Sequence, residues 1–339
     1  CFDLAGITKL SYPVANVTSL PSYCFAGTKI TNLSGAGNIK LIEFGDHCFD
    51  GCDLLQNIQH LTTIGVTSLP KYCFANCVSL ENLDGISDIK VLGENCFAGC
   101  LGLISIDKLR EAIDISKIPD YCFSGCTSLI SLDGIEKIIE LGVYAFSGCT
   151  KLSDIRAIER TNRAIVGGVG MITKIPSYCF QNCTSLKTLE GCYKIEEIGS
   201  YAFLGCSSLR SPSGLGTQIK TIQTGAFANC SGLQYFSCLA TSAPGLGSNV
   251  FSGVSTNSLN LYVRKGYESY YSASSGWKVF GRITSRTIKL SYDNLTSLSA
   301  TDVSNTFVTK VVHFDINEIP GSTISFVFCG LKSFFSTSA

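Results

Sequence analysis

Cysteine is the residue type in this chain that could most readily support chemistry, with 18 cysteines among 339 residues. Thiols form disulfides, bind zinc and act as nucleophiles, so this count invites all three interpretations. Most of the cysteines recur at two fixed places in a repeated phrase, of which Tyr121-Cys122-Phe123-Ser124-Gly125-Cys126 is an example. The first place directly precedes the phenylalanine, at Cys24, Cys48, Cys73, Cys96, Cys122 and Cys179. The second lies three residues after it, at Cys52, Cys77, Cys100, Cys126, Cys149, Cys183, Cys206 and Cys230.

Alanine replaces cysteine at the first place in three repeats, at Ala145, Ala202 and Ala226. That place therefore requires a small apolar side chain rather than a thiol, and a buried free cysteine behaves as a small hydrophobic residue. We predict that the repeated cysteines are buried and reduced, with some disulfides as the alternative. Zinc is disfavoured because the sequence has no CxxC pair and its three histidines lack ligand spacing. Three cysteines outside the repeated places are better candidates for reactive or paired thiols: Cys192, Cys238 and Cys329.

Other patterns that could indicate an enzyme are weak. The glycine-rich stretch 167–170 lacks the Lys-Ser/Thr of a phosphate loop, and Ser-His-Asp chemistry has no nucleophile elbow to start from. Asp84 and Asp133 occupy equivalent Asp-Gly turns in their repeats and do not form a convergent carboxylate pair. The sequence therefore predicts a protein that is not an enzyme, with no catalytic residues, no cofactor and no metal.

The repeated phenylalanine marks the structural unit that must position all these residues. A period near 24 residues is typical of a leucine-rich solenoid, in which successive units stack and bury a shared apolar column. We therefore predict an α/β or mainly β repeat solenoid, right-handed and of about ten coils, with the phenylalanines in one continuous buried column. These anchors are Phe25, Phe49, Phe74, Phe97, Phe123, Phe146, Phe180, Phe203, Phe227 and Phe251, at separations of 24, 25, 23, 26, 23, 34, 23, 24 and 24 residues.

A longer period of two coils is superimposed on this repeat. Most odd-numbered coils enter their phenylalanine through a proline, as at Pro70 and Pro119, whereas even-numbered coils tend to enter through a glycine, as at Gly93. Extra residues occur mainly between an even coil and the next odd coil, and the longest insert spans 156–170. Such length variation on one side is where repeat proteins commonly carry binding loops.

Recognition is predicted to use the exposed residues of short extended segments, together with the insert. Leucines such as Leu186 and Leu189 fit an extended segment of each coil and should point inward, so the residues between them should reach solvent on a common face. Arginine-rich loops also supply interface hot spots. The candidates are Glu81, Asn82, Ile130, Ser131, Asp154, Arg156, Arg160, Arg163, Lys187, Thr188, Arg210, Gln234 and Tyr235.

Composition and charge limit the kinds of partner that the protein can bind. Lys plus Arg and Asp plus Glu each number 26, so no global field steers the protein toward nucleic acid, and the apolar runs are too short to span a bilayer.

We expect a solenoid over residues 1–258 and an aromatic C-terminal cap over residues 259–283. A small β-rich unit, read as truncated, should follow over residues 284–339.

The phrase Tyr-Cys/Ala-Phe-x-Gly-Cys-Thr-Ser-Leu, as in Tyr121 to Leu129, resembles the BspA-like leucine-rich repeats of bacterial and protist surface proteins. The resemblance covers about residues 13–258. It implies a secreted or surface-anchored, non-enzymatic adhesion module that binds an extracellular matrix or cell-surface protein. An alternative is a carbohydrate-binding surface component, in which the C-terminal β-rich unit would carry a glycan site.

Overall fold

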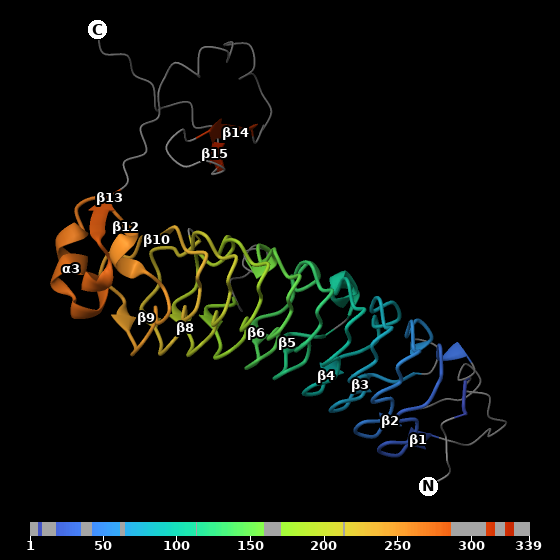
Figure 1. Ribbon diagram of the computed structural model, residues 1–339. Helices are drawn as coiled ribbons and strands as arrows, with labels where there is room; N and C mark the ends of the chain where they lie inside the picture. Colours follow the sequence, from blue (N-terminus) through green and yellow to red (C-terminus); the bar gives the residue numbers. More distant parts are fainter. Residues whose placement is uncertain are drawn as a thin grey trace, which may run out of the picture. The chain divides into compact units, whose positions relative to one another are not determined.

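The computed structural model describes residues 6–8, 18–34, 43–61, 65–112, 114–158, 171–212, 214–285, 310–315 and 323–328. The chain divides into two compact units, residues 1–287 and 288–339. The first unit is a parallel β-solenoid of about ten turns whose coils follow one another in sequence order (Figure 1). In the second unit, β14 (Lys310–Asp315) pairs with β15 (Thr323–Phe328) in antiparallel register.

The phenylalanine anchors form the continuous buried column that their spacing predicts. Each anchor is at most 9% exposed, and neighbouring rings stack with centroids 5.2–6.0 Å apart and planes within 11° of parallel. The stack is unbroken even where 34 residues separate two anchors, since Phe146 and Phe180 lie 5.7 Å apart. The long insert therefore leaves the coil without disturbing the core.

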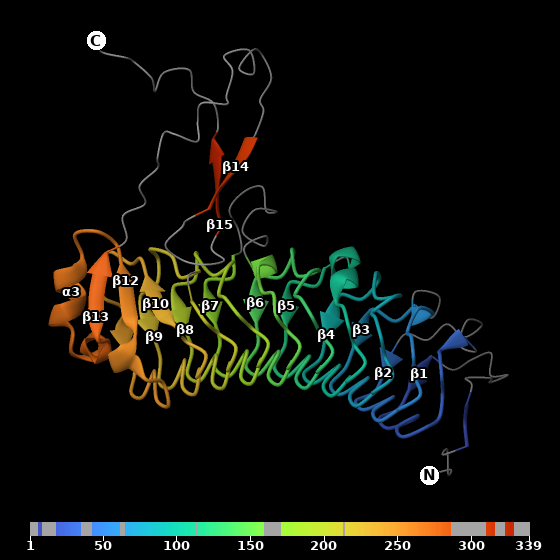
Figure 2. The same ribbon diagram turned by 45° about the horizontal axis from the view of Figure 1, so that its top comes forward.

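Each coil has a regular strand of two residues just before the residue that leads to the anchor, which in most coils is a proline or a glycine (Figure 2). In most of them the first residue faces outward and the second is buried. These strands are β1 (Ser19–Leu20), β2 (Glu43–Phe44), β3 (Ser68–Leu69), β4 (Val91–Leu92), β5 (Lys117–Ile118), β6 (Glu140–Leu141), β7 (Lys174–Ile175), β8 (Glu197–Ile198), β9 (Thr221–Ile222) and β11 (Gly245–Leu246).

Proline explains why the sheet is interrupted every second coil. The Gly93 amide donates to the carbonyl oxygen of Leu69 at 2.7 Å, which extends the ladder from an odd coil to the next even coil. Proline at the same place has no N–H to donate, so β1-β2, β3-β4 and β5-β6 are separate two-stranded sheets. Gln223 stands where proline would, and its amide donates to the Ile198 carbonyl at 2.8 Å. The sheet accordingly runs through four strands there, in the order β11-β9-β8-β7.

The leucine-flanked segments differ from the strands that the sequence predicts. Strand β10 (Tyr235–Cys238) lies in such a segment, but the others make mainly single inter-coil hydrogen bonds or isolated bridges, such as Ser131 with Asp154. The reason is local: polar side chains at the second of the two residues between the leucines turn the backbone immediately after that residue.

The last coil is covered by an aromatic segment. Strands β10, β12 (Asn260–Val263) and β13 (Arg282–Ser285) form a parallel three-stranded sheet, joined through the short helix α3 (Glu268–Ala273) and the 3-10 turn η4 (Ser275–Val279). The Trp277 ring lies 6.3 Å from Phe251, the last anchor, and its indole N–H donates to the Pro244 carbonyl at 2.9 Å. Two further 3-10 turns are η2 (Asp107–Glu111) and η3 (Thr256–Ser258).

Two features are absent from the described residues. Within this part of the chain, no helix combines the length and apolar character needed to cross a membrane. The same residues contain no group of three or more His, Cys, Asp or Glu side chains arranged to hold a metal ion.

Candidate recognition surface

The two cysteine places play different parts in the structure. All sixteen described cysteines are free thiols, and all but Cys24 are buried. At the second place each thiol also donates a hydrogen bond, 3.1–3.3 Å long, to the carbonyl oxygen of the anchor phenylalanine one coil earlier; Cys126 and Phe97 are one such pair. The same carbonyl accepts the backbone N–H of its own coil, from Cys100. This weak bond distinguishes the second place from the first, where alanine also occurs.

Burial makes most of these thiols poor nucleophiles. Loss of hydration raises the pKa of Cys192 and of Cys230 to about 12, and it raises the pKa of Cys126 well above its usual range. Cys192 and Cys238, which the sequence marks as candidates for reactivity, are also buried, and Cys329 lies outside the described residues. Cys52 is the exception among the described cysteines, because a hydrogen bond with Cys77 lowers its pKa. The others contribute packing and weak hydrogen bonds rather than a reactive centre.

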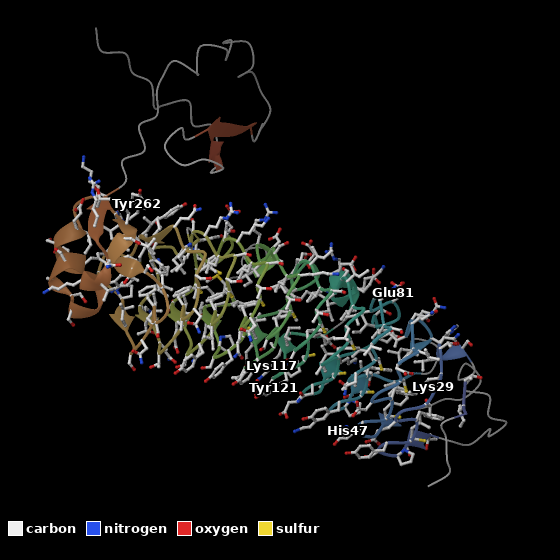
Figure 3. The ribbon with its side chains drawn as sticks, viewed as in Figure 1. Lys29, His47, Glu81, Lys117, Tyr121 and Tyr262 are labelled. Atoms are coloured by element: carbon white, nitrogen blue, oxygen red, sulfur yellow. The ribbon has the colours of Figure 1, made fainter. Side chains whose placement is uncertain are left out.

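In each leucine-flanked segment, the residue directly after the first inward-facing leucine lies at the surface. Together these residues form an exposed surface that we call the outer column. Inter-coil backbone hydrogen bonds align neighbouring members: the Ile104 N–H donates to the Glu81 carbonyl at 3.1 Å, and the Ile130 N–H donates to the Ile104 carbonyl at 3.3 Å. All members are exposed except the half-buried Ser153. The outer column consists of Gln56, Glu81, Ile104, Ile130, Ser153, Lys187, Arg210 and Gln234. Figure 3 shows Glu81 on the edge of the solenoid opposite His47 and Tyr121.

The second residues of the same segments shape the turns. The Asn82 amide oxygen accepts the Asp84 N–H at 3.0 Å, the Ser131 hydroxyl accepts the Asp133 N–H at 3.4 Å, and Asp154 accepts the Arg156 N–H at 2.8 Å. Such contacts two residues along the chain are typical of Asx and Ser/Thr turns. Three of the candidate binding residues, Asn82, Ser131 and Asp154, thus hold the backbone in shape.

The other candidates are placed as follows. Thr188 is half-buried, and the Tyr235 ring packs edge-on against Tyr262 at 5.4 Å. The Arg156 guanidinium lies against the Asp154 carboxylate at 2.6 Å, although its side chain remains 59% exposed. Arg160 and Arg163 lie outside the described residues.

The centre of the outer column is apolar. Ile104 and Ile130 are 50% and 49% exposed on adjacent coils, with Glu81 on one side and with Lys187 and Arg210 further along on the other. Ile104 was not among the sequence candidates. The same alternation could have identified it, since Ile104 lies between the buried residues Leu103 and Ile106.

A second row at the surface, the tyrosine column, was not predicted; Tyr23 and Tyr121 in it are exposed, and its other members are half-buried. It lies two residues before each anchor, where the backbone φ is +57° to +60°, and its rings stack with centroids 4.3–5.0 Å apart. Left-handed backbone is unusual for bulky residues, so each ring offsets a local conformational cost by stacking on its neighbours. The column consists of Tyr23, His47, Tyr72, Tyr121, Tyr144, Tyr178 and Tyr201.

Comparison with known proteins agrees with this architecture. The family profile described as "BspA type Leucine rich repeat region (6 copies)" matches residues 1–117, 42–165 and 170–275. No curated protein matches the chain by sequence.

Two solved structures illustrate the structural likeness. A leucine-rich repeat protein from Bacteroides ovatus is 20% identical, with a TM-score of 0.53 over 80% of this chain and 70% of its own. A leucine rich cell surface protein from Faecalibacterium prausnitzii is 15% identical, with a TM-score of 0.28 over 84% of this chain and 89% of its own. The first comparison supports the fold alone, and the second is too distant to add to it.

Proposed function

This chain belongs to the BspA-type leucine-rich repeat family, and we propose that it is a non-enzymatic, secreted or cell-surface module that binds a protein through the outer column. The partner would be an extracellular matrix protein or a protein on another cell. Stacked coils repeat each exposed position into a broad surface, which suits a protein partner better than a small molecule.

The observation that carries this proposal is the exposed pair Ile104 and Ile130 within a polar column. Isolated exposed apolar residues are ordinary, but two on adjacent coils, with charged residues further along the same column, reproduce the apolar centre and polar rim of protein interfaces. Neither isoleucine turns the backbone, unlike the residues that follow them, Ser105 and Ser131. Their side chains are therefore available to a partner.

The test is a binding assay of the full chain on immobilised matrix proteins and on intact cells. Ile104→Asp combined with Ile130→Asp should weaken binding by about tenfold or more, since hot-spot residues at the centre of an interface carry much of its affinity. Val91→Asp is the matched control, because Val91 is 55% exposed in β4, outside the outer column. Equal binding by the double variant and the control would exclude the outer column.

The same assay separates protein binding from the glycan alternative. Deglycosylating the immobilised targets should leave binding intact if the partner surface is protein. Loss of binding after deglycosylation, or after deletion of residues 288–339 alone, would favour a carbohydrate-binding component instead.

A further inference from the structure

The tyrosine column is interrupted once between rings, at Asn95. Tyr72 and Tyr121 flank this position one coil away on either side, and each already stacks on a neighbour, on His47 at 4.3 Å and on Tyr144 at 4.6 Å respectively. Asn95 has the same left-handed backbone as the tyrosines, with φ at +58°. The interruption is therefore one of side chains and not of backbone.

The coils on both sides of Asn95 stay in the register of the rest of the solenoid. Tyr72 N–H donates to the Glu94 carbonyl and Asn95 N–H donates to the Asp120 carbonyl, both at 3.0 Å. The corresponding bond from Tyr23 to Asp46 is also 3.0 Å. The coils have thus neither moved apart nor closed up around Asn95.

This register gives the width of the space between the two flanking rings, which we call the Asn95 gap. Around His47, the successive ring separations of 4.4 and 4.3 Å place Tyr23 and Tyr72 about 9 Å apart, with one flat ring between them. Tyr72 and Tyr121 have the same two-coil offset. The Asn95 gap therefore has the thickness of one flat aromatic ring and holds only a short carboxamide.

The gap is open to solvent. Tyr121 is 39% exposed even though Tyr144 covers one of its faces. The position that follows Tyr201 in the next coil is Gly225, and no such open space exists there. The Tyr201 ring occupies the space that a side chain at Gly225 would need. No hydrogen bond joins the Asn95 carboxamide to another residue of the described part of the chain, so its donor and acceptor are unpaired there.

We propose that the Asn95 gap binds one planar aromatic side chain of a partner polypeptide, sandwiched between Tyr72 and Tyr121. A flat ring would complete the column at the spacing its own members adopt, and the Asn95 amide could pair with a phenol hydroxyl or an indole N–H. A pyranose ring carries axial hydrogens on both faces and lacks the flat faces that the members of the column present to one another. The site lies on a different edge from the outer column and does not depend on it (Figure 3).

The proposal is tested with N-acetyl-L-tyrosinamide and N-acetyl-L-tryptophanamide, titrated into the full chain and followed by ligand-observed NMR. A single sandwiched ring should bind with a dissociation constant on the order of millimolar. Asn95→Tyr fills the gap with a ring of the column's own kind and should reduce this binding about tenfold or more. Tyr72→Ala removes one wall and should weaken binding several-fold.

The matched control is Asn249→Tyr, which adds a ring at the equivalent place in the last coil, where φ is +56°, and leaves the gap untouched. It should bind the probes as the unaltered chain does. Equal binding by the Asn95→Tyr variant would overturn the proposal, as would no binding to the unaltered chain at about 20 mM probe. Preferential binding of methyl pyranosides, lost in the Asn95→Tyr variant, would also overturn it by identifying a sugar site.

Discussion

Alkaline pH should unfold the solenoid steeply, because its core contains many protonated thiols. Burial raises the pKa of the half-buried Cys24 and of fourteen buried cysteines. The fourteen keep their protons in the folded state at pH values where an unfolded chain loses them. As pH rises above the pKa of an unfolded thiol, about 8.5, the unfolded state binds fewer protons than the folded state, and stability falls. The fourteen are Cys48, Cys73, Cys77, Cys96, Cys100, Cys122, Cys126, Cys149, Cys179, Cys183, Cys192, Cys206, Cys230 and Cys238.

The magnitude follows from linkage. At pH 9.5, about one unit above the pKa of the unfolded thiol, each such cysteine lowers the free energy of unfolding by about 1.4 kcal/mol. Fourteen of them together remove about 20 kcal/mol, which exceeds the 5–15 kcal/mol that typically holds a folded protein together. The loss should be only about 2 kcal/mol at pH 8, where most thiols of the unfolded chain are still protonated.

The assay is urea unfolding followed by far-ultraviolet circular dichroism between pH 7 and 9.5, with a phosphine reductant to prevent oxidation. A variant with Cys73→Ala, Cys96→Ala and Cys122→Ala is the control, because alanine occupies this place in other coils. It should stay folded to a higher pH than the unaltered chain, because it contains three fewer such thiols. A free energy of unfolding that changes by less than about 3 kcal/mol between pH 7 and 9.5 would refute the reasoning.

Three further outcomes are expected. Phe123→Ala should lower the free energy of unfolding by about 3–5 kcal/mol, measured by urea unfolding, because it leaves a cavity in the middle of the column; a loss below about 1 kcal/mol would contradict a tightly packed stack. Cys126→Ala should destabilise more than Cys122→Ala by about 0.5–1 kcal/mol, since only Cys126 donates a thiol hydrogen bond, to Phe97; equal losses in the same assay would make that bond irrelevant. Replacing Arg156, Arg160 and Arg163 together with alanine should weaken partner binding about tenfold in a surface-immobilised binding assay. Its melting temperature should not change, and unaltered affinity would remove the insert from the binding surface.

Much of the candidate surface could be predicted from the sequence, but the roles of neighbouring residues could not. The paired leucines correctly indicate that the residues between them face outward, and Glu81, Ile130, Lys187, Arg210 and Gln234 are indeed exposed. Alternation alone treats both residues between two leucines alike. Only the hydrogen bonds show that the second residue of several pairs turns the backbone.

The sequence by itself determined the repeat, its buried phenylalanines and the two-coil period. These follow from local requirements, because every coil packs on a near-copy of itself and needs the same small and large apolar side chains at the same places. The alternation of proline and glycine is also visible in the sequence. Its consequence for the sheet is visible only in the structure, which shows the carbonyl of the neighbouring coil to which proline has no N–H to donate.

Tertiary structure decided which groups meet across coils, since residues about 24 apart become neighbours through stacking. The thiol of Cys126 reaches the carbonyl of Phe97, and Tyr121 stacks on Tyr144, only because the coils superpose at a fixed rise and register. A repeat pattern records that a tyrosine recurs two residues before its anchor. It does not state that the left-handed backbone there turns the rings face to face, or that Asn95 leaves a ring-sized gap between two of them. Those features depend on through-space distances, which the stacking of complete coils sets.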